Sequence, residues 1–337
     1  MKIECSACQK TFEIPKERLP VGKEIVFPCP ACKENIKLDL RSTSARDSAS
    51  APQTEETQAS GDTLKKAILQ SVGDLPPMPQ TVFKVREIIA NPKSSFKELG
   101  DILETDQAMA TKVLKIANSS YYGLAGKVST LKQASVVLGH KTIGDLMTMA
   151  STSGLLGNNL EGYELDAGDL WRHSLGVAIG SKIIANMKAP ALAEDAFAAG
   201  LIHDAGKLIL DKYVLERAEA FKEYMADGKQ SFLNAEKHIL GFDHSEIASE
   251  ACKSWHVPQT LTVAIRYHHY PIESQEDKLT YIVHVADAIA MMTGLGLGRD
   301  GLLYRMDDKA MEFLGIEVPD ISTIMSEVVE SVENIAQ

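Results

Sequence analysis

Long apolar runs, aromatic residues and basic charge are all scarce in this sequence, and each scarcity excludes a class of protein. No stretch of about 18 apolar residues is present, so we expect no membrane-spanning helix. The first residues, MKIECSACQK, lack the apolar segment of a secretory signal, which places the chain in the cytoplasm. Aromatic residues make up 6% of the 337 residues, whereas alanine, leucine, isoleucine and methionine are common. This composition favours helices over sheets.

The charge balance is acidic, with 35 Lys and Arg against 46 Asp and Glu and a net charge of −11. Such a chain does not attract nucleic acid or an anionic membrane through its overall charge. A membrane partner is therefore not expected and a nucleic-acid partner is not supported, although a local basic patch remains compatible with this charge.

Residues 41–61 lack every large apolar side chain. Their sequence, RSTSARDSASAPQTEETQASG, contains no Leu, Ile, Val, Met or aromatic residue. A segment of this kind cannot bury enough apolar surface to offset the entropy lost on ordering. We predict a disordered linker that separates residues 1–40 from a helical remainder.

Four of the five cysteines precede this linker and form two pairs with identical spacing. Cys5 and Cys8 make one pair, Cys29 and Cys32 the other, and 20 residues lie between the pairs. In a reducing cytoplasm this spacing is typical of a structural zinc site, because four thiolates close a tetrahedron around the ion. We predict that residues 1–40 form a zinc ribbon with short strands at Thr11–Ile14 and Asn35–Leu40; the alternative is four unrelated reduced thiols or a redox pair. A protein partner could bind through the ribbon or through the helical domain.

From Thr63 onward the apolar spacing is helical almost throughout, which predicts an all-α domain. The helices expected from the pattern are Thr81–Ala90, Ala108–Asn118, Leu170–Met187, Phe197–Leu210, Glu246–Trp255, Pro258–His268, Lys278–Met292 and Ser322–Ile335. Eight of the nine histidines fall within residues 158–294. We therefore divide this part into an N-terminal helical part, residues 62–157, and a second part, residues 158–337, where chemistry is expected.

The string GLIHDAGK, Gly200–Lys207, places His203 beside Asp204 in an otherwise apolar helix. A buried carboxylate is costly unless a cation neutralises it. With His173 and Asp287, these residues supply two imidazoles and two carboxylates, a suitable ligand set for iron, manganese, zinc or magnesium. Three further histidines could hold a second metal: His244, His268 and His269.

The remaining histidines have a plainer interpretation. Neutral imidazoles readily hydrogen-bond to backbone groups, so we assign four of them to structural positions. These four are His140, His238, His256 and His284. Cys252, alone in a helical segment, is expected to be a buried and unreactive thiol.

The order and spacing of His173, the His203–Asp204 pair and Asp287 resemble the HD phosphohydrolase superfamily, which is helical and metal-dependent. The further His244 and His268–His269 positions resemble its two-metal members, such as the HD-GYP cyclic dinucleotide phosphodiesterases. That resemblance implies a phosphate-contacting role for Lys207, one turn after Asp204; the alternative is a surface lysine. Tyr270–Glu273 lacks the glycine of the Gly-Tyr-Pro loop, which weakens the phosphodiesterase assignment.

The segments before the histidines resemble the HDOD domain, the HD-related output domain of bacterial signalling proteins. The similar strings are LPPMP at Leu75–Pro79, ELGDILETDQA at Glu98–Ala108, LKIANSSY at Leu114–Tyr121 and ASVVLG at Ala134–Gly139. This resemblance implies a regulatory module that senses a ligand, such as a nucleotide, or binds a partner. The alternative is a metal-dependent phosphohydrolase acting on nucleotides or cyclic dinucleotides.

Overall fold

The computed structural model describes short segments before residue 107 and a nearly continuous segment after it. The short segments are residues 2–4, 11–13, 24–28, 32, 35–39 and 63–69, with the positions 84, 85, 88, 91 and 98. From residue 107 to residue 336 it is continuous except for 125, 256, 297 and 299–305. The chain divides into two compact units, Met1–Ala59 and Ser60–Gln337. The predicted linker, residues 41–61, lies outside the described residues.

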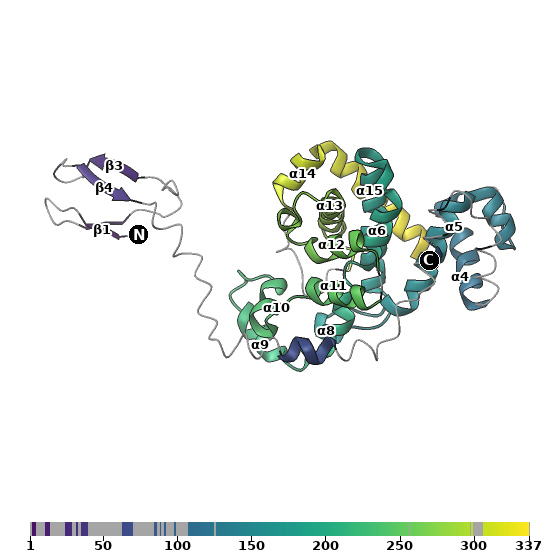
Figure 1. The fold of residues 1–337 in the computed structure, drawn as a ribbon, viewed down its shortest axis with the longest axis horizontal. Coiled ribbons are helices and arrows are strands. Elements are labelled where there is room, and N and C mark those ends of the chain that lie inside the picture. Colours follow the sequence, from purple (N-terminus) through teal and green to yellow (C-terminus); the bar gives the residue numbers. More distant parts are fainter. Residues whose placement is uncertain are drawn as a thin grey trace. The chain divides into compact units, whose positions relative to one another are not determined.

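The described part of the first unit consists of two antiparallel hairpins (Figure 1). Strand β1 (Lys2–Glu4) pairs with β2 (Thr11–Glu13), with Ile3 opposite Phe12. Strand β3 (Glu24–Pro28) pairs with β4 (Asn35–Asp39), with Val26 opposite Lys37. Three of the four predicted zinc ligands, Cys5, Cys8 and Cys29, lie outside the described residues, and Cys32 is exposed. The zinc ribbon therefore stays a prediction.

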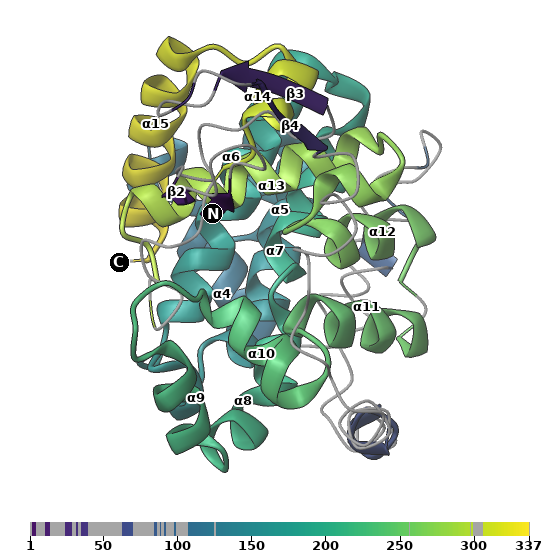
Figure 2. The ribbon, with the colours of Figure 1, turned by 90° about the vertical axis from the view of Figure 1, so that its left-hand side faces the viewer.

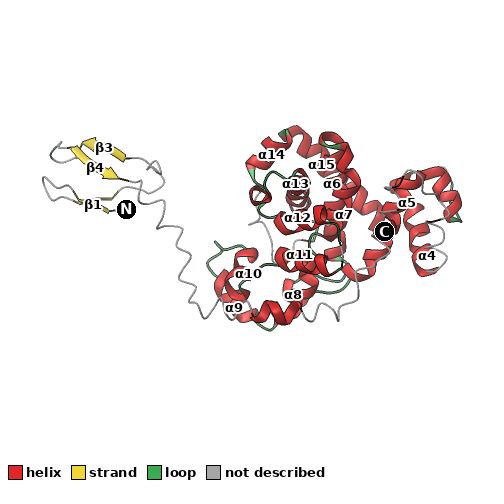
Figure 3. Cartoon of the chain, viewed as in Figure 1, coloured by secondary structure: helices red, strands yellow, loops and turns green. Residues whose placement is uncertain are grey.

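The described part of the second unit is helical, apart from one isolated bridge between Leu160 and Leu165 (Figure 3), which confirms the all-helical prediction for this unit. Its α-helices are α4 (Gln107–Ala117), α5 (Leu131–Leu156), α6 (Asp169–Lys188), α7 (Ala193–Ile202), α8 (Ala205–Leu215), α9 (Ala218–Met225), α10 (Phe232–Leu240), α11 (His244–Ser254), α12 (Gln259–Tyr267), α13 (Lys278–Met292), α14 (Asp308–Leu314) and α15 (Val318–Ala336). Short 3-10 turns lie between them, η4 (Ser120–Tyr122), η5 (Glu161–Tyr163), η6 (Pro190–Leu192) and η7 (Pro271–Ser274). No described helix is both long enough and apolar enough to cross a membrane.

Side chains just before several helices fix where those helices begin. Asp243 accepts a hydrogen bond from the backbone N–H of Glu246, and Asp277 accepts one from that of Thr280. Such caps satisfy amide groups that the first helical turn leaves without partners. The Asp243 cap has a functional consequence, because it makes His244 the first residue of α11.

Two apolar clusters form the core of the second unit. The larger gathers side chains of α4 to α7 and α11 to α15, including Leu175, Leu201 and Ile282. The smaller lies around α8 to α10 and includes Phe221, Phe232 and Ile68, the last from the helical residues 63–69. Helices α11, α12 and α13 lie side by side in both views (Figures 1 and 2).

Glycines permit the closest helix contacts. A Cβ atom on Gly200 of α7 would lie 2.9 Å from the Cα of Ala178 on α6, so the backbones of these helices nearly touch. Helix α5 is interrupted at Gly139, whose φ of 82° is accessible to glycine at low cost. The close approach of α6 and α7 brings His173 and His203 within reach of each other.

Candidate metal centre

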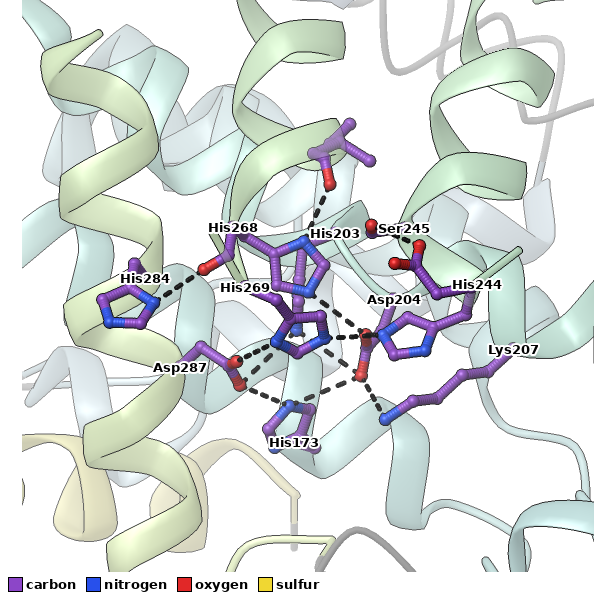
Figure 4. Close-up of polar contacts among 12 residues, drawn as sticks. His173, His203, Asp204, Lys207, His244, Ser245, His268, His269, His284 and Asp287 are labelled. Atoms are coloured by element: carbon purple, nitrogen blue, oxygen red, sulfur yellow. Dashed lines mark hydrogen bonds and ion pairs between the residues drawn. The ribbon is translucent and has the colours of Figure 1, made fainter. Parts of the chain in front are cut away.

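Seven buried side chains from separate helices converge on one point in the second unit (Figure 4). Helix α6 contributes His173, the segment between α7 and α8 contributes His203 and Asp204, α11 contributes His244, the end of α12 contributes His268 and His269, and α13 contributes Asp287. Asp287 Oδ1 lies 3.1 Å from Nε2 of His173 and 3.7 Å from Nε2 of His203. All seven predicted ligands are therefore together, and none exposes more than 9% of its side chain.

His203 and Asp204 do not lie within one helix, and the prediction of a single helix over Phe197–Leu210 is wrong. Helix α7 ends at Ile202 and α8 begins at Ala205. Asp204, with φ −96° and ψ 10°, departs from helical geometry. In an uninterrupted helix neighbouring side chains point about 100° apart, whereas this turn lets both side chains face the same centre.

The ring orientation of four histidines is fixed by their Nδ1 atoms. Each Nδ1 faces an oxygen that can only accept, so Nδ1 carries the hydrogen in the neutral ring. The acceptors are Leu295 O for His173 at 3.1 Å, Gly200 O for His203 at 2.7 Å, Ile265 O for His268 at 2.8 Å and Glu236 Oε2 for His244 at 2.8 Å. Every Nε2 lone pair therefore points inward, as metal-binding imidazoles require.

Asp204 divides its two oxygens between two groups of ligands. Its Oδ2 lies 3.6 Å from Nε2 of His173 and 3.5 Å from that of His203. Its Oδ1 lies 3.2 Å from Nε2 of His244 and 3.8 Å from that of His268. We call His173, His203, Asp204 and Asp287 the first ligand group, and Asp204, His244, His268 and His269 the second ligand group. Asp204 belongs to both.

These residues fit a metal on chemical grounds. Nε2 of His203 is buried and has no hydrogen-bond partner among the described residues. A lone pair that faces carboxylate oxygens is repelled unless a cation lies between them. Imidazole and carboxylate together suit iron, manganese or zinc. The arrangement can therefore hold cations at two positions that share one carboxylate.

The electrostatics of the site support the same conclusion. Burial alone would raise the pKa of Asp204, but His203, Lys207 and His244 outweigh it and hold this pKa well below its usual range. Burial would likewise raise the pKa of Asp287, yet His173 and His203 hold it well below. Burial, with His203 nearby, lowers the pKa of His268 to about 3. At neutral pH both carboxylates are therefore ionised and His268 is neutral. Burial would lower the pKa of His203 and of His244, but Asp204 raises the former above its usual value and Glu236 raises the latter well above it. A metal that binds these two rings would therefore displace protons from them.

Comparison with known proteins identifies the family. Residues 75–271, more than half of the chain, match the model of the HDOD domain. The chain belongs to the HDOD family. The resemblance of the earlier segments to this domain is thereby confirmed.

Solved structures share the fold of this HDOD protein. An HDOD domain protein of unknown function from Geobacter sulfurreducens has a TM-score of 0.67 at 24% identity, covering 81% of this chain and 95% of that one. A candidate phosphohydrolase from Shewanella amazonensis SB2B has a TM-score of 0.61 at 25% identity, covering 80% and 97%. A candidate signal transduction protein from Marinobacter aquaeolei VT8 has a TM-score of 0.64 at 20% identity, covering 90% and 72%.

A curated relative is longer than this chain. An uncharacterised protein of Treponema pallidum (strain Nichols) is 22% identical over 243 residues. The match covers 70% of this chain but only 46% of that protein, so the chain spans about half the length of its relative.

Lys207 is not a surface residue, because it is 4% exposed and reaches into the centre of the HDOD domain. Its Nζ lies 2.8 Å from Oδ2 of Asp204, one turn earlier on the chain. The same Nζ lies 5.8 Å from the centre of the Tyr163 ring. A buried ammonium at this position neutralises the charge of Asp204.

Two side chains that contact the site, Glu236 and Tyr163, are not among the residues predicted from the sequence. Glu236 accepts hydrogen bonds from His244 and from the hydroxyl of Tyr163. A signal was present: the buried residues of α10 are Phe232, Ala235, Glu236 and Leu240, which is the spacing of one apolar helix face. A carboxylate on such a face predicts a buried polar contact.

Two of the four histidines that were assigned to structural positions, His284 and His238, make contacts that fit this role. Nδ1 of His284 donates to the carbonyl of His268, and its Nε2 accepts from the backbone N–H of Asp307 at 3.0 Å. His238 stacks on Tyr224, with ring centres 4.5 Å apart. His256 and the side chain of His140 lie outside the described residues. Cys252 is fully buried, and burial raises the pKa of its thiol to about 12, as expected of an unreactive thiol.

Proposed function

We propose that this HDOD protein is a signalling module whose helical domain is organised by a buried two-metal centre and senses a ligand or binds a partner. The observation that carries the proposal is the burial of the complete ligand set. All seven side chains face inward, and His269, the most exposed of them, shows 9% of its side chain. Metals held here would tie α6, α8, α11, α12 and α13 together. The occupancy of the centre would then set the arrangement of the helices that a ligand or partner meets.

The two ligand groups differ in composition but favour the same metals. The first ligand group has two carboxylates and two imidazoles, and the second has one carboxylate and three imidazoles. Magnesium prefers an all-oxygen shell, whereas iron, manganese and zinc accept imidazole nitrogen. We therefore propose iron, manganese or zinc for both positions.

A metal-dependent phosphohydrolase is the second candidate, and Lys207 is the observation that favours it. When bound, a divalent metal supplies a water of lowered pKa and polarises a phosphoryl oxygen. The ammonium of Lys207, 2.8 Å from Asp204, would offset negative charge on a bound phosphate. Nucleotides and cyclic dinucleotides are the substrate class that the sequence resemblance implies.

Metal counting combined with a hydrolysis panel tests the proposal. Metal would be measured by mass spectrometry on the full chain and on a fragment that begins at Ser60. The double variant His203→Ala, Asp204→Ala would be compared with His238→Ala, which removes an imidazole outside the centre. We expect about two metal ions per fragment, retained in His238→Ala and lost in the double variant.

The second measurement separates the two candidate functions. Phosphomonoesters, nucleotides and cyclic dinucleotides would be offered with Mn²⁺ or Fe²⁺. Absence of turnover in a fully loaded protein supports the signalling module. Turnover by the wild-type protein that is lost in the double variant would instead support the phosphohydrolase. A fragment that binds no metal would contradict both candidates.

For residues 1–40 we propose a structural zinc ion held by Cys5, Cys8, Cys29 and Cys32, with the ribbon docking to a protein partner. The spacing of the cysteine pairs supports this. The full chain should then contain one more zinc ion than the fragment, and Cys29→Ser with Cys32→Ser should remove it. Equal zinc contents in the full chain and the fragment would contradict the ribbon.

A further inference from the structure

Glu236 is a carboxylate in the interior of the domain. It lies on α10, is 0% exposed, and takes no part in either ligand group. Its Oε2 accepts from both the backbone N–H and the Nδ1 of His244, at 3.0 and 2.8 Å, and its Oε1 accepts from the hydroxyl of Tyr163. Among the described residues, His244 is the basic side chain that lies within 4 Å of Glu236. A buried carboxylate with this single charged contact acts mainly on that imidazole.

His244 differs in this respect from the other oriented histidines of the centre. His173, His203 and His268 each donate from Nδ1 to a neutral backbone carbonyl. His244 alone among these four donates to a carboxylate. Hydrogen bonds to an ionised acceptor are roughly twice as strong as neutral ones. The carboxylate therefore makes His244 a more basic ligand than its neighbours.

Glu236 is also part of a closed chain of contacts that includes two members of the second ligand group. His244 contacts Asp204, and Asp204 pairs with Lys207. The ammonium of Lys207 lies over the ring of Tyr163, whose hydroxyl donates to Glu236. The bond to the backbone N–H of His244 additionally holds the first residue of α11 in place. Glu236 thus controls both the position and the ring orientation of one ligand.

We infer that Glu236 is a positioning residue for the second metal. Glu236 holds the ring of His244 so that Nε2 of His244 points toward Asp204. The inference rests on the proposed metal centre. It predicts that the negative charge of Glu236, more than its size, sets the affinity of the second position. The first ligand group has no contact with Glu236, so its affinity is expected to stay unchanged.

The substitution Glu236→Gln tests this, because glutamine keeps the shape and removes the charge. The matched control is Glu246→Gln, which removes a carboxylate from the first turn of α11 that pairs with Lys65 and Arg266 instead of His244. Both variants would be titrated with Mn²⁺ and with Co²⁺, whose absorption spectrum reports the ligand geometry. We expect Glu236→Gln to weaken the second equivalent by about 10- to 100-fold, to change the Co²⁺ spectrum of that equivalent only, and to leave the first unchanged. Glu246→Gln should titrate like wild type.

The outcomes distinguish this inference from the proposed function. A wild-type protein that binds no metal overturns both. A wild-type protein with two metals and an unaltered Glu236→Gln titration overturns the inference alone, as does equal weakening of both equivalents. Should Glu236→Gln fail to fold, the imidazole ¹⁵N spectrum of loaded wild type decides: His244 protonated at Nδ1 supports the inference, and His244 protonated at Nε2 overturns it.

Discussion

Gly206 allows α8 to approach α11, and replacing it should disturb the centre in a predictable way. A Cβ atom at this position would lie 1.9 Å from the carbonyl oxygen of His244 and 3.0 Å from the amide nitrogen of Ala248. Both are backbone atoms, so neither can rotate away. Ordinary contact begins at 3.4 Å, which means that the two helices must separate by about 1.5 Å in Gly206→Ala.

The cost of that separation is set by two opposing effects. Overpacking of a tight contact costs about 1–3 kcal/mol, and the rigid backbone partner puts this case at the upper end. Alanine stabilises a helix by up to about 1 kcal/mol relative to glycine, which offsets part of this cost. We expect the free energy of unfolding to fall by about 2 kcal/mol, which lowers Tm by about 4–8 °C for a domain of this size. The distance between Asp204 and His244, now 3.2 Å, should lengthen and weaken the second ligand group.

Urea unfolding followed by circular dichroism, with and without metal, measures both effects. The control is Gly154→Ala in α5, where the nearest atom to a new Cβ is Nζ of Lys112 at 3.8 Å. This control should leave stability unchanged or raise it by up to about 1 kcal/mol. If Gly206→Ala unfolded at the wild-type midpoint and bound the second metal with wild-type affinity, the close approach of α8 and α11 would not be a requirement of the site.

Three further predictions concern other parts of the domain. Asn118→Ala removes three hydrogen bonds of 2.8 Å that join the Asn118 side chain to the backbone of Leu114 and Val128. The free energy of unfolding in urea should fall by about 2 kcal/mol, and a fall of less than about 0.5 kcal/mol would contradict this role. Chelation should lower Tm, and a metal at 100 times its Kd should restore about 2.7 kcal/mol; calorimetry that finds no shift would contradict a stabilising centre. Cys252, whose pKa burial raises to about 12, should resist iodoacetamide at pH 8 until denaturant is added, as peptide mass mapping can check.

Helices with a long, uninterrupted apolar pattern were predictable from sequence. Helix α13 runs over Lys278–Met292 as predicted, and α6 extends the predicted Leu170–Met187 by one residue at each end. The turn at His203 and Asp204 was not predictable, because GLIHDAGK continues the helical pattern without proline, and Asp204, although it is the N-cap residue of α8, makes no side-chain capping bond. Tertiary contacts decide it: both side chains must reach one centre, and Gly206 must contact α11.

The clustering of the candidate ligands was predictable from the sequence, whereas their supporting contacts were only partly so. Residue type and spacing pointed to His173, His203, Asp204 and Asp287, and the structure places each carboxylate within 3.7 Å of both imidazoles. Nothing local in the sequence indicates that Leu295 and Ile265 supply carbonyl acceptors, because any residue has a carbonyl. Glu236 was different, since a carboxylate on the apolar face of a helix is visible in the pattern.

In the proposed two-metal centre, the balance of charge would favour an anion as the ligand. Two divalent metals at the proposed positions, together with the ammonium of Lys207, would carry more positive charge than the carboxylates of Asp204, Asp287 and Glu236 neutralise, since imidazoles are neutral when they bind metal. A buried excess of positive charge is costly unless a negative group compensates it. Protonation of a carboxylate would increase the excess, and the same cations hold the carboxylates ionised. A phosphate or another small anion would complete the site, and this requirement is common to a module that senses a nucleotide and to an enzyme that cleaves one.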